Sequence, residues 1–131
     1  MEVKITHVDQ VKFSVQARSH TAICDQPAEN GGEDSGMTPP ELMLASLGTC
    51  AAFYAVQYLK ARDLLNGVEV TVTAEKLKGP ARLGNFKIRV ASPVTLTAEQ
   101  TEGLMRSVHH CLIHNTLLSP REIAIVLETG E

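Results

Sequence analysis

The sixteen residues from 44 to 59, "LASLGTCAAFYAVQYL", decide the fold of this chain, because they read as a helix with almost no polar side. The residues just before them, "TPPE" at 38–41, supply a threonine cap, a proline at the first helical position and Glu41 for a capping box. We predict a helix over 39–62. Because apolar residues occupy almost its whole circumference, this helix must be buried on most sides.

The chain has 131 residues, which is a length typical of one domain, and we predict a single domain over 1–131. A chain of this length has too few other helices to surround the helix over 39–62. We therefore expect a second copy of the chain to cover the remaining apolar surface, which makes a homodimer the predicted assembly.

The composition excludes several classes of partner. Hydrophobic residues make up 44% and charged residues 21% of the chain, the net charge is −3, and no basic run could neutralise a string of phosphates. We expect no nucleic acid partner. Ser46, Thr49 and Gln57 interrupt the longest apolar stretch, and the first residues, "MEVKITHVDQVKF", lack a secretory signal. We expect no membrane association and a cytoplasmic location.

The first part of the chain has the pattern of a small antiparallel sheet. Residues 11–17, "VKFSVQA", alternate apolar and polar side chains, which is typical of a strand with one buried face. We predict strands within 2–24. The stretch 26–37, "QPAENGGEDSGM", collects proline, glycine, asparagine and serine, and we predict a loop there without helix or strand.

The second part of the chain predicts a hairpin over 68–92, whose two strands alternate valine, isoleucine and phenylalanine with polar residues. A capping box opens the next predicted helix, 98–114, which places Cys111 in its apolar stripe. A short apolar run predicts a final strand over 122–128. The predicted fold class is α+β, with two layers.

The chain contains three cysteines, Cys24, Cys50 and Cys111, and they lack the close pairwise spacing of a zinc ribbon or a secreted disulfide scaffold. If they serve a function, redox chemistry is the leading one. The alternative for Cys50 and Cys111 is packing, since free cysteine is among the most buried residue types. Cys24 lies in a predicted strand and reads as an ordinary half-buried residue.

The segments "PPELMLASLGTCAAF" around Cys50 and "HHCLIHNTL" around Cys111, with the two cysteines 61 positions apart, resemble the OsmC/Ohr family of osmotically inducible and organic hydroperoxide resistance proteins. The resemblance implies an intertwined homodimer whose long central helices pack between antiparallel sheets. It also implies a thiol peroxidase for organic hydroperoxides, with Cys50 as the peroxidatic and Cys111 as the resolving residue. An external dithiol would reduce the resulting disulfide, and no cofactor is implied.

The resemblance further implies an arginine that activates the thiolate, held by a glutamate ten residues before the peroxidatic cysteine in an "NPE" motif. In this chain that position is Pro40, and Glu41 follows one residue later. The loop over 26–37 contains no arginine, which leaves Arg18 as the nearest candidate. Glu41 stands about 13 Å along the helix from Cys50, so it would act at the other subunit's cysteine or through an intermediary. The structural alternative for Glu41 is the capping box, and the alternative for Arg18 is a solvent-exposed strand position.

Two other functions stay open. A binding protein on the same scaffold would hold a small acyl or aromatic ligand in an apolar cleft between the long helices. A zinc-binding domain is suggested by His110 and His114, spaced i, i+4 beside Cys111. Adjacent positions on a helix point about 100° apart, so these three do not converge easily, and we predict no metal site. An imidazole could instead tune the thiol or donate to substrate, whereas His109 reads as a surface residue.

Overall fold

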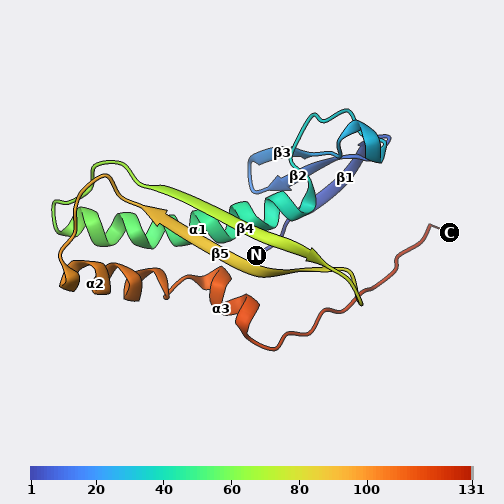
Figure 1. The fold of residues 1–131 in the computed structure, drawn as a ribbon. Coiled ribbons are helices and arrows are strands. Elements are labelled where there is room, and N and C mark those ends of the chain that lie inside the picture. Colours follow the sequence, from blue (N-terminus) through green and yellow to red (C-terminus); the bar gives the residue numbers. More distant parts are fainter. Residues whose placement is uncertain (131) are drawn as a thin grey trace. The chain divides into compact units, whose positions relative to one another are not determined.

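The structure of this protein is a computed structural model that describes residues 1–130, and Figure 1 shows the order of its elements. The strands are β1 (Lys4–Asp9), β2 (Lys12–Ala17), β3 (His20–Cys24), β4 (Glu69–Leu77) and β5 (Arg82–Ala91). The helices are the 3₁₀ turn η1 (Ala28–Asn30) and the α-helices α1 (Pro39–Ala61), α2 (Ala98–Val108) and α3 (Leu112–Leu118). The predicted α+β class is confirmed.

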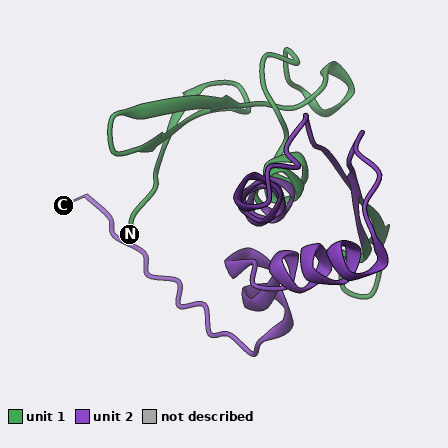
Figure 2. Cartoon of the chain, turned by 90° about the vertical axis from the view of Figure 1, so that its left-hand side faces the viewer, with its two compact units in different colours: residues 1–46, 73–86 green, residues 47–72, 87–131 purple. Residues whose placement is uncertain are grey.

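Contacts divide the chain into two compact units (Figure 2). The first unit comprises Met1–Ser46 and Thr73–Phe86, and the second comprises Leu47–Val72 and Lys87–Glu131. Helix α1 and the hairpin β4–β5 therefore each contribute to both units. The single domain predicted over 1–131 stays a prediction.

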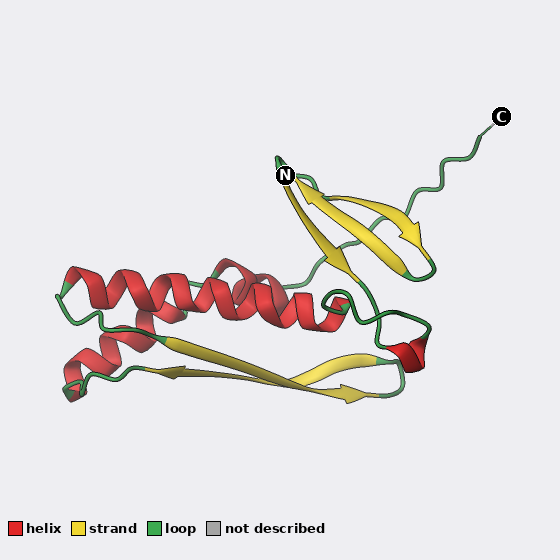
Figure 3. Ribbon diagram, turned by 90° about the horizontal axis from the view of Figure 1, so that it is seen from above, coloured by secondary structure: helices red, strands yellow, loops and turns green. Residues whose placement is uncertain are grey.

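The first unit is built on the antiparallel sheet β1-β2-β3, which Figure 3 shows as the three-stranded group of arrows. Phe13 pairs with Cys24 across β2 and β3, and an isolated bridge joins Cys24 to Met37. The residues between these two bridge partners thus form a closed loop. The prediction that 26–37 holds no helix is wrong at η1, where Gly31 ends one short turn in the left-handed conformation, at a φ of 88°.

A buried carboxylate organises this loop. Asp25 is 1% exposed and accepts hydrogen bonds from the backbone N–H groups of Gln26, Glu33 and Ser35, at 2.8, 3.1 and 3.1 Å. The hydroxyl of Ser35 donates a fourth bond at 2.7 Å. This last bond is the largest of the causes that together hold the pKa of Asp25 well below its usual range. The long loop is therefore an ordered segment tied to one side chain.

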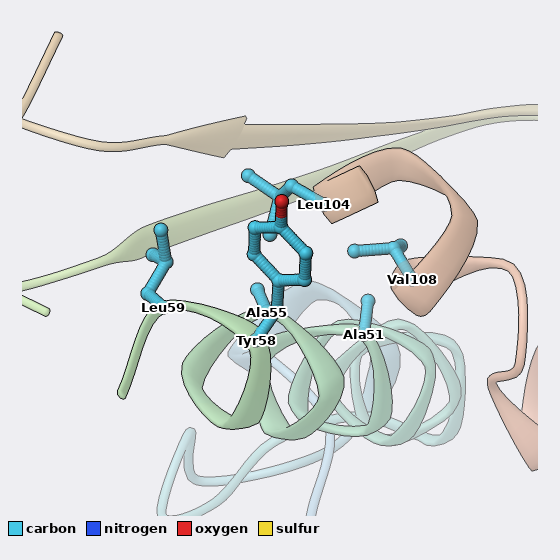
Figure 4. Close-up of a cluster of buried hydrophobic side chains, with 6 residues drawn as sticks. All are labelled: Ala51, Ala55, Tyr58, Leu59, Leu104 and Val108. Carbon is cyan, nitrogen blue, oxygen red and sulfur yellow. The ribbon is translucent and has the colours of Figure 1, made fainter. Parts of the chain in front are cut away.

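The core of the second unit lies where α1 packs against α2 (Figure 4). The buried cluster consists of Ala51, Ala55, Tyr58, Leu59, Leu104 and Val108. Two glycines bring the elements close, because a Cβ at Gly48 would lie 2.9 Å from Val72 Cγ2 and a Cβ at Gly103 would lie 2.4 Å from Tyr58 Oη. The small residues of α1 and α2 thus set how closely the layers approach.

Helix α1 ends at Ala61, one residue before the predicted end. A single chain leaves part of it uncovered, since the side chain of Phe53 is 57% exposed. Among residues 1–130, α1 is also the one helix that is long and apolar enough to cross a membrane. The core helix of a soluble protein meets the same criteria of length and composition. The expectation that one chain cannot bury this helix agrees with the exposure of Phe53.

Two predicted elements are wrong in their extent. The helix predicted over 98–114 is two helices, because the chain leaves helical geometry between α2 and α3 and Cys111 takes the N-cap position of α3. The strand predicted over 122–128 is not formed, because none of the described strands pairs with this segment. A strand needs a neighbour for its backbone groups, and apolar alternation alone does not supply one.

Candidate active site

The two cysteines of the predicted redox pair come from different elements of the second unit. Cys50 lies in the middle of α1, whereas Cys111 lies in the break that separates α2 from α3. As the N-cap of α3, the sulfur of Cys111 accepts a hydrogen bond from the backbone N–H of His114 at 3.4 Å. The break in the predicted second helix is therefore what turns Cys111 and the first amides of α3 into one local structure.

The structure brings the two sulfurs together. The side chain of Cys111 lies near enough to Cys50 to lower the pKa of its thiol, and both cysteines are free rather than joined in a disulfide. Two residues 61 positions apart in the sequence are thus neighbours in the structure. A peroxidatic and a resolving cysteine must be neighbours in this way.

The surroundings favour the thiolate at Cys50. Burial is the largest influence and raises the pKa of this thiol, but three donors oppose it: the thiol of Cys111 and the backbone N–H groups of Ile113 and Leu112. Their sum lowers the pKa of Cys50 below its ordinary value. Hydrogen bonds to the charged form are one of the ways by which a protein stabilises a buried anion.

The opposite holds for Cys111. Burial is the largest cause that raises the pKa of its thiol, and the hydrogen bond and charge of Cys50 raise it further. The N–H groups of His114 and Ile113 oppose this rise without cancelling it. Cys111 is 0% exposed, whereas Cys50 is partly exposed. The pair is therefore unequal, because the pKa of the partly exposed Cys50 is lowered and that of the buried Cys111 is raised.

Aromatic side chains continue from Cys50 along α1. Phe53 and Tyr54 meet edge to face at 5.3 Å between ring centroids, and the ring of Tyr54 lies 6.5 Å from that of His110. His109 and His114 form a second pair of rings, at 5.8 Å. Within residues 1–130 no group of three His, Cys, Asp or Glu side chains could hold a metal ion.

The other two candidates belong to the first unit. Glu41 completes the predicted capping box, with its carboxylate accepting from Thr38 N at 2.9 Å and Thr38 Oγ1 at 2.8 Å. The same two bonds lower the pKa of Glu41. Arg18 is exposed in the turn between β2 and β3, at a φ of 55°. The groups that favour the Cys50 thiolate come from α3 and its cap, so catalytic roles for Glu41 and Arg18 stay predictions.

No pattern in the sequence indicated the backbone donors at Cys50. Leu112 and Ile113 carry apolar side chains, and the contribution comes from their amides, which any residue type except proline would supply. The signal that could have revealed them is a cysteine read as a helix N-cap, but Cys111 continued the apolar stripe and concealed the break.

With this geometry in place, comparison with known proteins identifies the family. The family model described as OsmC-like protein matches residues 32–126, which is most of the chain. The chain belongs to the OsmC-like protein family. A search of curated proteins gives no match. The family that the cysteine segments suggested is thereby confirmed.

Solved structures agree on the fold. The OsmC-like protein from Mycoplasma pneumoniae has a TM-score of 0.72 and 18% identity, covering 89% of this chain and 86% of that one. The organic hydroperoxide resistance protein of Bacillus subtilis has a TM-score of 0.61 at 18% identity, covering 88% and 90%. A Legionella pneumophila structure, titled organic hydroperoxide resistance protein OsmC, has a TM-score of 0.59 at 19% identity, covering 89% of each chain. At these identities the likeness shows the fold.

Proposed function

We propose that this OsmC-like protein is a thiol peroxidase that reduces organic hydroperoxides with Cys50 as nucleophile and Cys111 as resolving residue. The observation that carries the proposal is the pair of neighbouring, unequal thiols, one partly exposed and one buried. The Bacillus subtilis and Legionella pneumophila structures described above are named organic hydroperoxide resistance proteins, which agrees with this reaction class.

The first step is attack of the Cys50 thiolate on the distal oxygen of the hydroperoxide. The O–O bond breaks, the sulfur is oxidised to a sulfenic acid, and the alkoxide leaves as the alcohol after taking up a proton. Cys111 then attacks the sulfenic sulfur, giving a disulfide and releasing water. The proximity of Cys111 to Cys50 supports this second step. An external dithiol returns both cysteines to thiols and is itself oxidised to a disulfide.

The assembly proposed for this activity is a homodimer in the cytoplasm. Phe53 on α1 is exposed in the single chain, and the apolar segment 123–127 is almost fully exposed, with Ile125 at 93%. Burial of exposed apolar groups in a second copy is favourable at about 25 cal/mol per Å². Light scattering coupled to size-exclusion chromatography should give twice the chain mass of 14.2 kDa, and a monomer at micromolar concentration would contradict the assembly.

The activity is tested by consumption of cumene hydroperoxide with a dithiol reductant, comparing wild type with Cys50→Ser, Cys111→Ser and the matched control Cys24→Ser. Cys24 is buried in the other unit and has no part in the reaction, so its variant should keep full turnover. Cys50→Ser should abolish turnover, whereas Cys111→Ser should form a sulfenic acid once and then stop. Turnover that is absent in wild type, or equal in wild type and Cys50→Ser, would refute the peroxidase.

The chemical product gives an independent check. After one equivalent of hydroperoxide, peptide mapping without reductant should find Cys50 linked to Cys111. Cys24 should still be a free thiol. A linkage that involves Cys24 would contradict the proposed pair. The alternative function, a non-catalytic protein that binds an acyl or aromatic ligand, draws support from the exposed aromatic ring of Phe53 beside Tyr54, and it predicts ligand binding with no loss of thiols.

A further inference from the structure

A cleft of about 380 Å³ opens between the C-terminal turns of α1 and the outer part of α2, within the second unit. The lining residues that matter are Gln57, Tyr58, Arg62, Arg106, Ser107 and His110. Among the described residues that line it there is no carboxylate, while two guanidinium groups and several uncharged polar groups face it. Arg62 and Arg106 also line an adjoining cleft of about 490 Å³, so the two cations lie between both hollows.

One of the two guanidinium groups is held in place. Arg62 stacks over the ring of Tyr58, with its Cζ 3.7 Å from the ring centroid, and donates one hydrogen bond to the Tyr58 carbonyl oxygen at 3.1 Å. A guanidinium has five N–H donors, so this arrangement fixes its orientation and leaves donors for a ligand. The stacking also removes part of the entropy that binding would otherwise cost.

The second guanidinium can change partner. Arg106 pairs with Glu102 at 3.2 Å in the i, i+4 arrangement, and both side chains are mostly exposed. Exposed ion pairs of this kind are weak, so an incoming oxyanion can replace Glu102. Glu99 lies in the adjoining cleft rather than in this one. Two arginines that face one hollow are the arrangement that proteins use to bind carboxylates and phosphates.

The position of the cleft relative to Cys50 indicates the rest of the ligand. Gln57 follows Cys50 by about 10 Å along α1, and Arg62 by about 18 Å. The ring of Tyr54 stands between them and contacts His110, which itself lines the cleft. The contact between Tyr54 and His110 therefore places an aromatic ring next to the cleft lining on the Cys50 side of α1, and aromatic rings suit contact with an apolar chain.

We propose that Arg62 and Arg106 bind the anionic end, a carboxylate or a phosphate, of an amphiphilic ligand whose apolar chain extends past Tyr54 toward Cys50. This rests on the proposed function in that the substrate would be a hydroperoxide that carries such an anion. The two arginines are specificity-determining residues and take no part in breaking the O–O bond. They are expected to affect how tightly an anionic substrate binds and to leave a small neutral hydroperoxide unaffected.

Binding is measured first with a probe that cannot react. Laurate, below its micelle concentration, is titrated calorimetrically into the reduced wild type and into Arg62→Gln, Arg106→Gln and the matched control Arg89→Gln. Arg89 is an exposed arginine of β5 that lines neither cleft, and its variant removes the same charge. Each cleft variant should raise the laurate Kd about tenfold, and the control should leave it unchanged. Equal Kd values for Arg106→Gln and Arg89→Gln would overturn the proposal.

Other probes identify the chemistry of the anion. Dodecanol has the same chain without a charge and should bind at least about tenfold more weakly than laurate. Dodecyl phosphate distinguishes the two sources of negative charge, and tighter binding of either anion than of dodecanol supports the site. Dodecanol that binds as tightly as both anions would show that only the apolar chain is recognised, and the proposal would be wrong.

Kinetics separate this proposal from the peroxidase itself. With the hydroperoxide of linoleic acid, Arg106→Gln should raise KM about tenfold with kcat unchanged, while the methyl ester of the same hydroperoxide and cumene hydroperoxide should show no change. No turnover with any hydroperoxide would refute the peroxidase and leave the laurate result standing. Turnover with all three, equally in wild type and Arg106→Gln, would refute the anion site alone.

Discussion

Replacing Gly103 by alanine tests the packing of α2 on α1, which holds the core of the second unit together. The added Cβ would lie 2.4 Å from Tyr58 Oη, 2.7 Å from Tyr58 Cε2 and 2.8 Å from Tyr58 Cζ, all shorter than a van der Waals contact. Tyr58 is 9% exposed and stacks under the guanidinium of Arg62, so its ring has little room to move. Either the ring or the helix must shift.

Two opposing effects set how much Gly103→Ala changes the free energy of unfolding. Overpacking of a well-filled core costs about 1–3 kcal/mol, whereas exchanging glycine for alanine inside a helix gains about 1 kcal/mol. Gly103 lies within α2, so both effects apply. We expect Gly103→Ala to lower the free energy of unfolding by about 1 kcal/mol in the wild-type background.

The sign of this change in free energy of unfolding should reverse when the ring of Tyr58 is removed. In a Tyr58→Leu background the clash is absent, so Gly103→Ala should raise the free energy of unfolding by about 1 kcal/mol through helix propensity alone. Urea unfolding followed by circular dichroism measures all four proteins of this cycle, at one protein concentration because a dimer's stability depends on it. A loss of equal size in both backgrounds would refute the packing argument.

Three further predictions concern the sulfur pair and the loop. Cys111→Ala removes the thiol donor from Cys50 and should raise the Cys50 pKa. Iodoacetamide should then modify Cys50 several-fold more slowly at pH 7, and the profile of rate against pH should move to higher pH. An unchanged profile would contradict this prediction. Because folding lowers the pKa of Asp25, its stabilising contribution is complete above about pH 4 and is lost as the pH falls. The difference in free energy of unfolding between wild type and Asp25→Asn, measured with urea, should therefore shrink on acidification. A difference that stays constant with pH would count against this prediction. Gly32→Ala places a Cβ 1.9 Å from the Gln26 carbonyl oxygen and should lower the free energy of unfolding, measured with urea, by about 3 kcal/mol. An unchanged free energy of unfolding would exclude the observed loop.

The parts of the fold that the sequence predicted are those encoded by local signals. The capping boxes at Thr38 and Thr97 mark where α1 and α2 begin, and in the structure each makes its reciprocal hydrogen bonds. The hairpin β4–β5 and the sheet β1-β2-β3 follow from alternation and from turn residues between the strands. In such segments the structure is determined by neighbours in the sequence, so the sequence alone was sufficient to predict them.

The missed elements depend on contacts distant in the sequence. Residues 122–128 have the alternation of a strand, but strand formation requires a neighbour that periodicity cannot reveal. Similarly, Leu104, Val108 and Cys111 continue one apolar stripe, so the pattern predicted a single helix. The chain instead breaks before α3, which places the buried Cys111 against Cys50. An apolar stripe records which residues are buried and not whether the backbone between them stays helical.

This break changes the question of how Cys50 is activated. The family resemblance implies an activating arginine, and the loop 26–37 contains none, although a buried thiol needs help because burial raises its pKa. The structure meets the same requirement with the amides of Leu112 and Ile113 and the thiol of Cys111, which lower the Cys50 pKa despite burial. The two amides carry no net charge and do not titrate, so these two donors are kept at every pH at which the protein is folded. The helix break and the activation of the thiolate are therefore one feature, because a continuous helix over 98–114 would bond those amides to its own preceding carbonyls.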